Sequence, residues 1–524
     1  MASHESFLQT VNQGYTFKGE SFQLGLGMLD KQAVPGASVN LPLKTMNRHG
    51  LIAGATGTGK TKTLQLLAEG LSDASIPVVL MDIKGDLSGI AAAGASNAKI
   101  EERMALMGKP FQPAAFPVEL MTLSDEQKGV RLRATVSEFG PILLSKILGL
   151  NDTQQGIVAM IFKFCDDNKM PLLDLKDFIK VIQYISDEGK SELEKDYGKI
   201  STSSTGTILR KVIELQQQGA DAFFGEPSFE VEDLMRISDD GRGVISILRV
   251  MELQDRPKLF STFMLSLLAE LYATLPEEGD MDKPKLCLFI DEAHLVFQEA
   301  NEALLQQIET VIKLIRSKGV GIFFCTQNPQ DVPASVLSQL GLKVQHALRA
   351  FTAADRKVIK TAAENYPLTD YYKVDELLTQ LGIGEAFVTL LNEKGIPSPL
   401  VHTLLVPPRS RMDVLTDAEL DQLVSKSKLV RKYAETLDSE SAHEMITAKL
   451  EEAAERSAAA AEKEAKEKEE EKETKRPAKK EESFFDNPTV KQVGRTAATI
   501  ITRSLLGALG LGGRTTRRKK TGWF

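Results

Sequence analysis

Apolar residues in this chain gather in short continuous runs, and the stretches between the runs have apolar residues at helical spacing. Continuous apolar runs are typical of strands buried on both faces of a parallel sheet, and their alternation with helices is typical of an α/β fold. The runs predict a mainly parallel sheet with strands at 50–53, 76–83, 243–248, 286–290, 319–326, 342–348, 386–391 and 401–406, the last two forming an antiparallel pair.

Two regions depart from this alternation. Residues 100–240 carry helical spacing with little strand signal, so we expect a large helical insertion that serves recognition. The run Ser201–Gly206 inside it is either a loop with a helix cap or a binding site. Ahead of residue 50, only Phe22–Leu26 and Ser38–Leu43 have strand character, and we expect a strand or two there. The helices expected in the insertion are 145–150, 155–165, 173–184 and 207–217.

The composition changes after Pro407 and Pro408. Glu462–Arg476 is almost continuous Glu and Lys, which predicts a solvated helix or a disordered spacer. Val490–Gly512 has apolar residues at helical spacing and is followed by a basic end, a pattern that suits a membrane surface, a nucleic acid or a partner protein. The alternatives for it are a helix that docks on its own core and an unstructured tail. We divide the chain into a leader 1–45, a core 46–410, a charged helical or disordered linker 411–482 and an amphipathic basic segment 483–524.

The turn after the strand 50–53 fits the pattern G-x-x-x-x-G-K-[ST], in which backbone N–H groups surround nucleotide phosphates at a helix N-terminus. Lys60 would place its charge between the β- and γ-phosphates, and the Thr61 hydroxyl suits Mg²⁺. We therefore expect ATP and Mg²⁺ as ligands. The alternative is a glycine-rich turn that binds nothing. The residues expected to contact nucleotide are Gly54, Ala55, Thr56, Gly57, Thr58, Gly59, Lys60, Thr61 and Lys62.

Polar residues follow three of the other predicted strands. Asp291 and Glu292 end the run 286–290, where the first acid can hold the metal ion and the second can orient the attacking water. Asp291 would serve equally as a helix N-cap. Gln327 follows the run 319–326 and would sense the γ-phosphate or belong to a Gln-Asn-Pro turn. Lys84-Gly85-Asp86, which follows Asp82, lies at the carboxyl end of a parallel strand, where open α/β sheets build their sites.

Four blocks in order, GATGTGKT, MDIKGD, LFIDEAH and RSKGVGIFFCTQNPQDVP, resemble the HerA/FtsK superfamily of ring-forming, DNA-pumping ATPases. The similarity covers roughly residues 20–410 and is closest to bacterial HerA-like proteins that consist mainly of the ATPase core. It implies a RecA-like P-loop NTPase fold and a homo-oligomer, commonly a hexamer. It also implies that an arginine of one subunit reaches the γ-phosphate held by its neighbour.

The resemblance assigns two arginines. Arg316 falls on the position of the finger that acts across the subunit boundary, and Arg48 falls on a second arginine near the nucleotide. From the residues alone, Arg316 would be an ordinary cation at a helix C-terminus and Arg48 a solvated charge ahead of a strand. Arg349, after the run 342–348, is a further candidate.

The chain departs from the family in two ways, and these departures weaken the inference that it moves DNA. The leader is too short for the N-terminal β-barrel of HerA translocases, and the DNA-binding gamma domain of FtsK is not recognisable. A formal charge of −8 gives no global attraction to DNA, so any contact would be local, as in the pore of a ring. We predict an ATPase that moves DNA. The alternatives are a membrane-associated motor of the conjugation or secretion type and a nucleotide-switched scaffold.

Cysteine and histidine content bounds the remaining possibilities. The three cysteines lie in apolar stretches without paired spacing, which fits a reducing cytoplasm. Six histidines are scattered, and only His294 lies near the two acids, so no zinc site is expected. The first residues have no signal-peptide pattern, and no run is long enough to span a membrane. We expect a bacterial cytoplasmic protein, with peripheral membrane binding through the C-terminal segment as the alternative.

Overall fold

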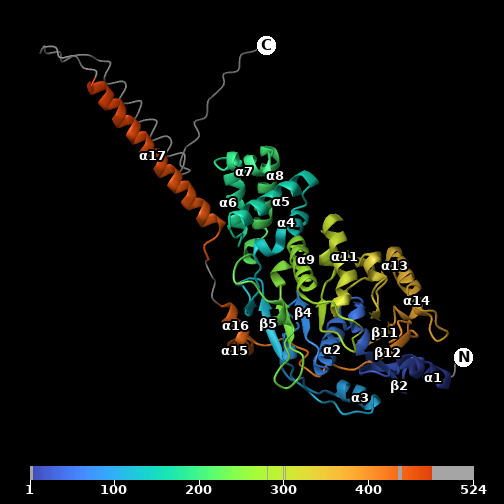
Figure 1. Cartoon of the computed structure of the whole chain (residues 1–524). Coiled ribbons are helices and arrows are strands. Elements are labelled where there is room, and N and C mark those ends of the chain that lie inside the picture. The colour runs from blue at the N-terminus through green and yellow to red at the C-terminus, as the bar shows by residue number, and fades with distance from the viewer. Residues whose placement is uncertain are drawn as a thin grey trace, which may run out of the picture. The chain divides into compact units, whose positions relative to one another are not determined.

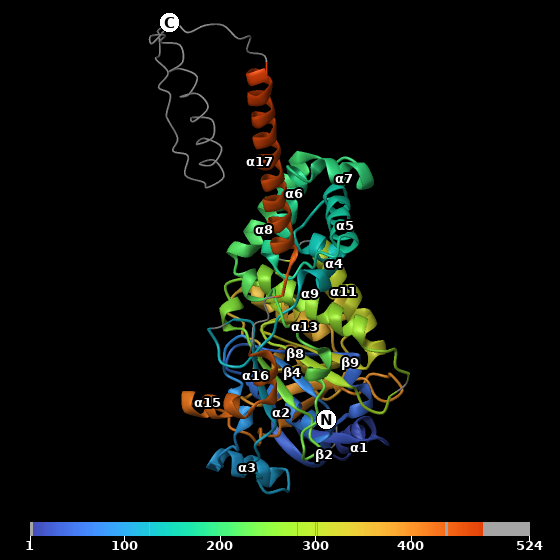
Figure 2. The same ribbon diagram turned by 60° about the vertical axis from the view of Figure 1, so that its left-hand side comes forward.

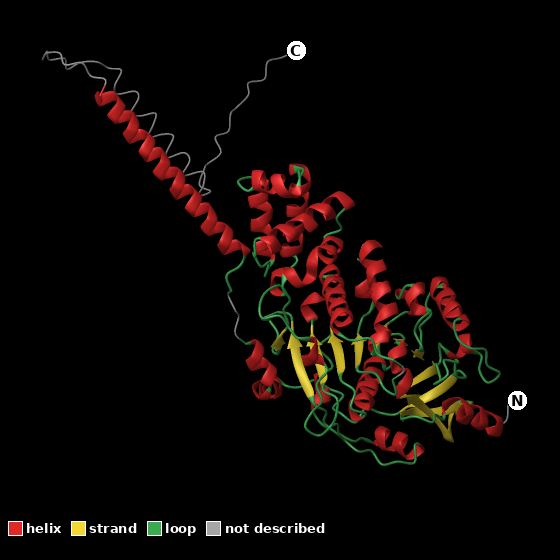
Figure 3. Cartoon of the chain, viewed as in Figure 1, coloured by secondary structure: helices red, strands yellow, loops and turns green. Residues whose placement is uncertain are grey.

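The computed structural model describes residues 4–474 except 125, 280, 299, 301 and 435–438. The chain divides into two compact units, Met1–Leu450 and Glu451–Phe524. The first unit contains the sheet and the helices that cover it, and Figure 3 shows the strands in a single layer with helices on both sides. The predicted amphipathic segment and its basic end lie outside the described residues.

Twelve strands of the described chain form one sheet. Its order is β2-β1-β12-β11-β10-β3-β9-β8-β4-β7-β5-β6, and all neighbours from β10 to β6 are parallel. The four strands at the other end, β11, β12, β1 and β2, pair antiparallel. The strands are β1 Ser21–Leu29, β2 Gln32–Pro42, β3 Gly50–Ala53, β4 Val78–Asp82, β5 Val118–Thr122, β6 Val130–Arg131, β7 Ile245–Arg249, β8 Leu286–Ile290, β9 Val320–Thr326, β10 Leu342–Gln345, β11 Glu385–Leu390 and β12 Val401–Leu405.

The central strands are buried on both faces, as their continuous apolar runs predicted. Alternate residues enter two different cores: Leu51 and Leu288 pack on one face of the sheet, and Ile52 and Phe289 pack on the other. Helix α2 (Lys60–Asp73) covers the second face, and helices α9 (Pro257–Thr274) and α11 (Glu302–Ile315) cover the first (Figure 1). Figures 1 and 2 both place α4–α8 beyond α9, on the side away from the sheet.

The predicted helical insertion is confirmed for its central part. Its five helices share the core of the first face with α9 and α11. Ser201 is the N-cap of α8, so the Ser201–Gly206 run opens a helix rather than forming a loop. The helices are α4 Val136–Ile147, α5 Asp152–Asp167, α6 Leu175–Ser186, α7 Lys190–Tyr197 and α8 Thr202–Gln217.

The same region also contains two strands that the sequence analysis missed. β5 joins the sheet beside β7, and β6 pairs with β5. Glu119 interrupts the apolar run of β5. Glu119 is 7% exposed, and its carboxylate forms an ion pair with Arg236 at 2.7 Å, which compensates the buried charge. The strand was missed because this charged residue interrupts the apolar pattern and its partner lies far away in the sequence. β6 has only two residues, too few to show a period.

The leader supplies the predicted pair of strands, both longer than expected. β1 and β2 form a hairpin whose tip, Asp30-Lys31, has positive φ at both residues, as a tight hairpin turn requires. β1 also pairs with β12, which extends the sheet, and helix α1 (His4–Tyr15) packs against β2. Residues 21–42 are thus an extension of the sheet.

The remaining helices connect strands or follow the sheet. Three short connectors and α13 lie between the later strands, and α3 follows β4. α15 and α16 bury Leu420 and Tyr433, whereas every residue of 451–468 in α17 is exposed, as expected for a solvated, charged helix. None of the helices in the described chain has the length and apolar content needed to cross a bilayer. These helices are α3 Ala98–Leu106, α10 His294–Phe297, α12 Ala334–Leu337, α13 Ala353–Glu364, α14 Val374–Leu377, α15 Asp417–Lys426, α16 Lys428–Tyr433 and α17 Ala442–Thr474.

Candidate functional site

The glycine-rich turn lies between β3 and α2, at the edge of the sheet where the parallel strands end, called here the carboxyl edge. Gly54, Gly57 and Gly59 have φ values of 154°, 78° and 112°, a region that side chains disfavour. At Gly54 a Cβ would also come within 2.5 Å of the His346 side chain. The loop therefore requires glycine both for its backbone conformation and for its close contact with β10's end.

Lys60 folds back over this loop. Its Nζ donates to the Ala55 carbonyl at 3.2 Å, and the Thr58 hydroxyl donates to the same carbonyl at 2.7 Å. Lys60 is only 6% exposed, and burial lowers the pKa of its ammonium. Thr61 and Lys62 follow in the first turn of α2, whose backbone N–H groups have no partner within the helix. The Lys62 ammonium itself points elsewhere and donates to the Met412 carbonyl.

Buried hydrogen bonds attach the glycine loop and α2 to the residues that follow β10. The Ala55 N–H donates to the Ala347 carbonyl at 2.8 Å, and the Thr63 hydroxyl lies 2.8 Å from His346 Nε2. Burial lowers the pKa of His346 to about 4, so its imidazole is neutral at neutral pH. These contacts join α2 to the end of β10 and fix the position of the loop.

Asp291 and Glu292 follow β8 at the same edge. Asp291 is 2% exposed, and burial raises the pKa of its carboxyl, although the nearby Lys84 opposes that shift. Glu292 is 6% exposed and has a φ of 45°, which a residue with a side chain rarely adopts. The Ala293 N–H donates to the Cys325 carbonyl at 2.9 Å, so the turn that carries both acids is attached to the neighbouring strand β9.

Lys84 joins these acids and is the residue that the sequence analysis left without a role. Its Nζ forms an ion pair with Glu292 and stands 3.8 Å from Asp291 Oδ2. The charges of the two acids raise the pKa of Lys84, although burial opposes them. His294 Nδ1 lies 3.2 Å from the second oxygen of Glu292. Two signals in the sequence pointed to Lys84: its position after a parallel strand and its place in the MDIKGD block.

The metal-binding prediction can be tested on Asp291. Its Oδ2 is buried and has no hydrogen-bond partner, which is the state expected of a ligand oxygen reserved for a cation. Asp291 and the first turn of α2 with Thr61 lie at the same edge of the sheet. In the described chain no cluster of three or more His, Cys, Asp or Glu side chains is arranged around a metal. A single carboxylate and a hydroxyl suit Mg²⁺, which is commonly bound by few protein ligands together with phosphate oxygens.

Gln327 lies at the carboxyl end of β9 and is exposed. The alternative interpretation placed Gln327 in a Gln-Asn-Pro turn, and the turn is present. The Asn328 side chain accepts the Gln330 N–H at 3.1 Å and caps a short 3₁₀ helix. Gln327 lines an open pocket together with His294 and Phe297. The turn and the exposed amide are therefore both present, and the amide faces the same pocket as the histidine that contacts Glu292.

Arg316 and Arg48 are not part of this constellation. Arg316 immediately precedes β9 and is exposed, and Arg48 precedes β3 and lies beside Gly395 in the turn after β11. Both positions are at the amino edge, where the parallel strands begin. The seven residues of β9 place Arg316 about 20 Å from the carboxyl edge. Arg349, in contrast, follows β10 at the carboxyl edge and is exposed.

The comparisons with known proteins agree with this arrangement. The family model described as "Helicase HerA-like C-terminal" matches residues 28–517. The chain belongs to this HerA-like family. None of the curated proteins matches the sequence.

Solved structures of the plasmid coupling protein TrwB have a similar fold. Its complex with the GTP analogue GDPNP has a TM-score of 0.50 at 14% identity and covers 78% of this chain and 95% of TrwB. The complex with the ATP analogue ADPNP has a TM-score of 0.50 at 13% identity, with 78% and 94% covered. The complex with ADP and Mg²⁺ has a TM-score of 0.47 at 15% identity, with 77% and 100% covered. The two structures with a TM-score of 0.50 show that the HerA-like chain has the RecA-like fold of TrwB.

A pocket of about 230 Å³ lies beside the P-loop of the HerA-like chain. It is bounded by Gly59, Lys62 and Thr63, by Ile100 and Arg103 of α3, and by residues at the ends of β11 and β12. Arg103 donates to the carbonyls of Ile383, Gly384 and Leu405 at 3.1 to 3.3 Å, which fixes α3 over this end of the sheet. The pocket lies on the side of the P-loop opposite to the acids.

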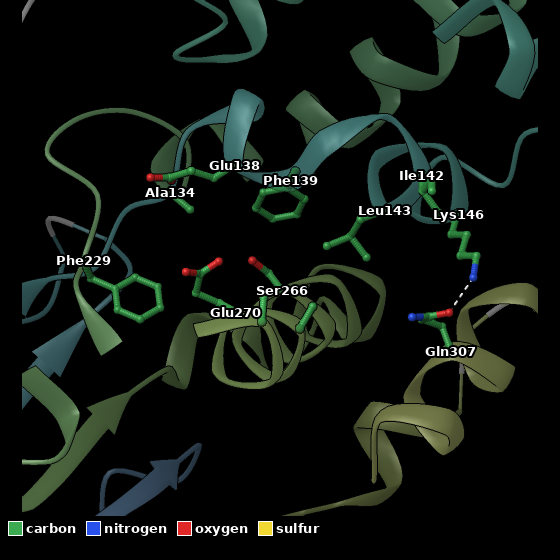
Figure 4. Close-up of a pocket in the computed structure, with 12 residues that line it drawn as sticks. Ala134, Glu138, Phe139, Ile142, Leu143, Lys146, Phe229, Ser266, Glu270 and Gln307 are labelled. Carbon is green, nitrogen blue, oxygen red and sulfur yellow. Dashed lines mark hydrogen bonds between the residues drawn. The ribbon is translucent and has the colours of Figure 1, made fainter. Parts of the chain in front are cut away.

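Another cavity, of about 220 Å³, lies far from this edge, between α4 of the insertion and the helices α9 and α11 (Figure 4). Glu270 and Ser266 point into it from α9, and Phe139 and Leu143 face it from α4. Lys146 donates to Gln307 at 2.5 Å and closes one end. No residue of the P-loop or of the acid-bearing turn lines it, so we assign it no part in nucleotide binding.

Proposed function

We propose that this HerA-like chain hydrolyses ATP with Mg²⁺ as a ring-forming motor and couples the reaction to movement of DNA. The observation that carries the hydrolytic part is the arrangement at the carboxyl edge. A glycine loop with a buried lysine, an acid with an unpartnered buried oxygen and a second acid with strained backbone all lie at one edge of one sheet. These are the parts that phosphoryl transfer in P-loop NTPases requires.

Each residue has a role in this proposal. Backbone N–H groups of 54–62 and the Lys60 ammonium would bind the phosphates, and Thr61 and Asp291 would hold Mg²⁺, which neutralises phosphate charge when bound. Glu292 would orient the attacking water, and Gln327 would contact the γ-phosphate or that water. The pocket bounded by Gly59, Lys62 and α3 suits the base and ribose, because it continues from the P-loop on the side away from the acids.

The amino-edge arginines support an oligomer, most simply a hexamer. The phosphates bind at the carboxyl edge, so Arg316 of one chain would reach only the nucleotide of another chain. The same reasoning applies to Arg48. A neighbour's arginine would stabilise the charge that develops on the transferred phosphoryl group. An arginine that binds the phosphate of a neighbouring chain would not need to lie near the P-loop of its own chain. The position of Arg316, about one strand length from its own P-loop, agrees with such a role.

Two other functions remain as alternatives. Similarity to the plasmid coupling protein TrwB favours a motor of the conjugation type, which would act at a membrane. A scaffold that assembles on ATP without mechanical work would be favoured by the overall charge of −8. The first alternative predicts that the protein sediments with anionic vesicles and that deletion of 483–524 abolishes this binding.

The proposal is tested by measuring ATPase rates with and without single- and double-stranded DNA, together with the mass of the assembly. We expect Mg²⁺-dependent turnover that DNA raises severalfold, and a mass near that of a hexamer. Lys60→Ala is the control, because loss of the phosphate-binding charge should remove both binding and turnover. ATPase activity that DNA leaves unchanged would favour the scaffold, and a monomer with full activity would contradict the ring.

A further inference from the structure

A side-chain nitrogen lies close to each carboxylate oxygen of Glu292, although neither oxygen accepts a hydrogen bond from the described residues. The Lys84 ammonium pairs with Oε1, and His294 Nδ1 lies 3.2 Å from Oε2. Each carboxylate oxygen keeps a further lone pair, but the ammonium that is ion-paired with Glu292 fixes the orientation of the carboxylate and neutralises the charge that would polarise an attacking water. The ion pair therefore restrains Glu292, and full activation of the water would require the Lys84 ammonium to leave.

The backbone at Lys84 is fixed. Asp82 accepts hydrogen bonds from the N–H groups of Gly85, Asp86 and Leu87 at 2.7, 3.1 and 3.2 Å. Gly85 has a φ of 76°, and a Cβ there would lie 2.3 Å from Met251 Sδ, so the turn requires glycine. The chain therefore presents Lys84 at a defined position on the carboxyl edge.

The side chain of Lys84, in contrast, can change partner. It is 36% exposed, whereas that of Glu292 is 8% exposed. Lysine carries its charge on a flexible four-carbon stem, so the ammonium can move by several ångströms without a change in the backbone. Glu292 is buried and its backbone is strained, so of the two partners Lys84 is the one free to leave.

The two positive charges of Lys60 and Lys84 balance the two negative charges of Asp291 and Glu292. Both lysines face Asp291 and Glu292. Burial is the main cause that lowers the pKa of Lys60, and the positive charge of Lys84 lowers it further, so the two cations share one electrostatic environment. A triphosphate would add negative charge next to Lys60. The γ-phosphate would then compete with Glu292 for the Lys84 ammonium, because charge-assisted bonds to phosphate are strong.

On the basis of the proposed ATPase function, we propose that Lys84 exchanges Glu292 for the γ-phosphate of ATP. Without nucleotide, and with ADP, the ammonium stays on Glu292 and restrains it. With ATP, the ammonium moves to a γ-phosphate oxygen and releases Glu292 to orient water. Lys84 thus couples the activation of Glu292 to the presence of the third phosphate.

The test is a double-mutant cycle on nucleotide binding, which does not depend on turnover. Wild type, Lys84→Met, Glu292→Gln and the double variant are titrated with ADPNP and with ADP in the presence of Mg²⁺. Glu292→Gln frees Lys84, so ADPNP should bind about tenfold more tightly than to wild type, in the range of couplings between groups in contact. This gain should disappear in the double variant, and ADP binding should show no such coupling.

The controls separate this exchange from simpler effects. Lys84→Arg keeps the charge and should retain most of the gain in the Glu292→Gln background. Lys283→Met removes a lysine that donates to the Ala74 carbonyl at the amino edge and should leave ADPNP binding unchanged. Thermal unfolding of each variant verifies that it folds.

Four results would contradict the proposal or its basis. An equal gain with and without Lys84 would mean that Glu292→Gln only removes repulsion between a carboxylate and phosphate. No gain in either background would mean that Lys84 does not contact the γ-phosphate. Either result overturns the exchange and leaves the ATPase function intact. Failure of wild type to bind ADPNP, or binding that survives Lys60→Ala, would instead overturn the proposed function itself.

Discussion

At the carboxyl edge of the parallel sheet, Lys60, Asp291 and Glu292 are at most 6% exposed, whereas Arg316 at the amino edge is exposed. Burial of charge is costly unless a partner compensates it, and at the carboxyl edge Lys84 pairs with an acid. Arg316 at the amino edge is not part of this cluster. In the proposed ring, one chain would hold the phosphates and the neighbour's amino edge would complete the site.

His49, which lies at the amino edge beside Arg48, has a structural role. His49 Nδ1 accepts the Ile322 N–H at 3.0 Å, and Nε2 donates to the Ile312 carbonyl at 2.9 Å. Burial lowers the pKa of His49 to about 4, so the ring is neutral at neutral pH and serves as a hydrogen-bonding link between β3, β9 and α11. A rigid amino edge of this kind would hold Arg316 in a fixed position relative to a neighbouring subunit.

The largest expected effect comes from removing the amino-edge finger. Arg316→Ala should bind ATP normally, because its own P-loop is intact, and should lose turnover by about a thousandfold, as for other arginines that act across a subunit boundary. Co-expression with Lys60→Ala should restore part of the ATPase rate, since mixed rings contain intact P-loops next to intact fingers. Mixed rings without any recovery would count against a finger at 316, and Arg349, at the carboxyl edge, would be the next arginine to replace.

A smaller effect is expected at the carboxyl edge itself. Glu292→Gln keeps the shape of the side chain and removes the charge that orients water, so the ATPase rate should fall about a hundredfold or more. The variant should still bind ATP, and the measurement is single-turnover hydrolysis beside an equilibrium titration. Turnover at the wild-type rate would show that another residue orients the water. Glu309→Gln, on α11, is the control and should leave the rate unchanged.

The smallest effect concerns stability behind the P-loop. Thr63→Val keeps the volume of the side chain and removes the hydroxyl that lies 2.8 Å from His346 Nε2. The loss of one buried hydrogen bond should lower the free energy of unfolding by about 1 kcal/mol. Thermal or denaturant unfolding measures it. Thr310→Val is the matched control, because that exposed hydroxyl donates to the Gln306 carbonyl one turn earlier in α11. Equal losses in both variants would mean that the buried bond contributes nothing specific.

Much of the fold followed from pattern. β8 was predicted with its exact bounds, and β9, β10, β11 and β12 were predicted within a few residues, because buried parallel strands are continuous apolar runs. β5 was missed because Glu119 interrupts its run and is compensated only by Arg236, a contact 117 residues away. The long strands β1 and β2 were underestimated because glycine and polar residues break their alternation.

The sequence by itself determined the P-loop and the two acids, since a glycine loop and a strand-end acid are local features whose chemistry depends on residue type. Only the tertiary structure decided which charges share an edge. It placed Lys84 on Glu292, left Asp291 Oδ2 without a hydrogen-bond partner, and put Arg316 and Arg48 at the opposite edge. Two charged side chains pair only when they lie within a few ångströms of each other. Here that requires strands far apart in the chain to become neighbours in the sheet, and no local sequence pattern predicts those distances.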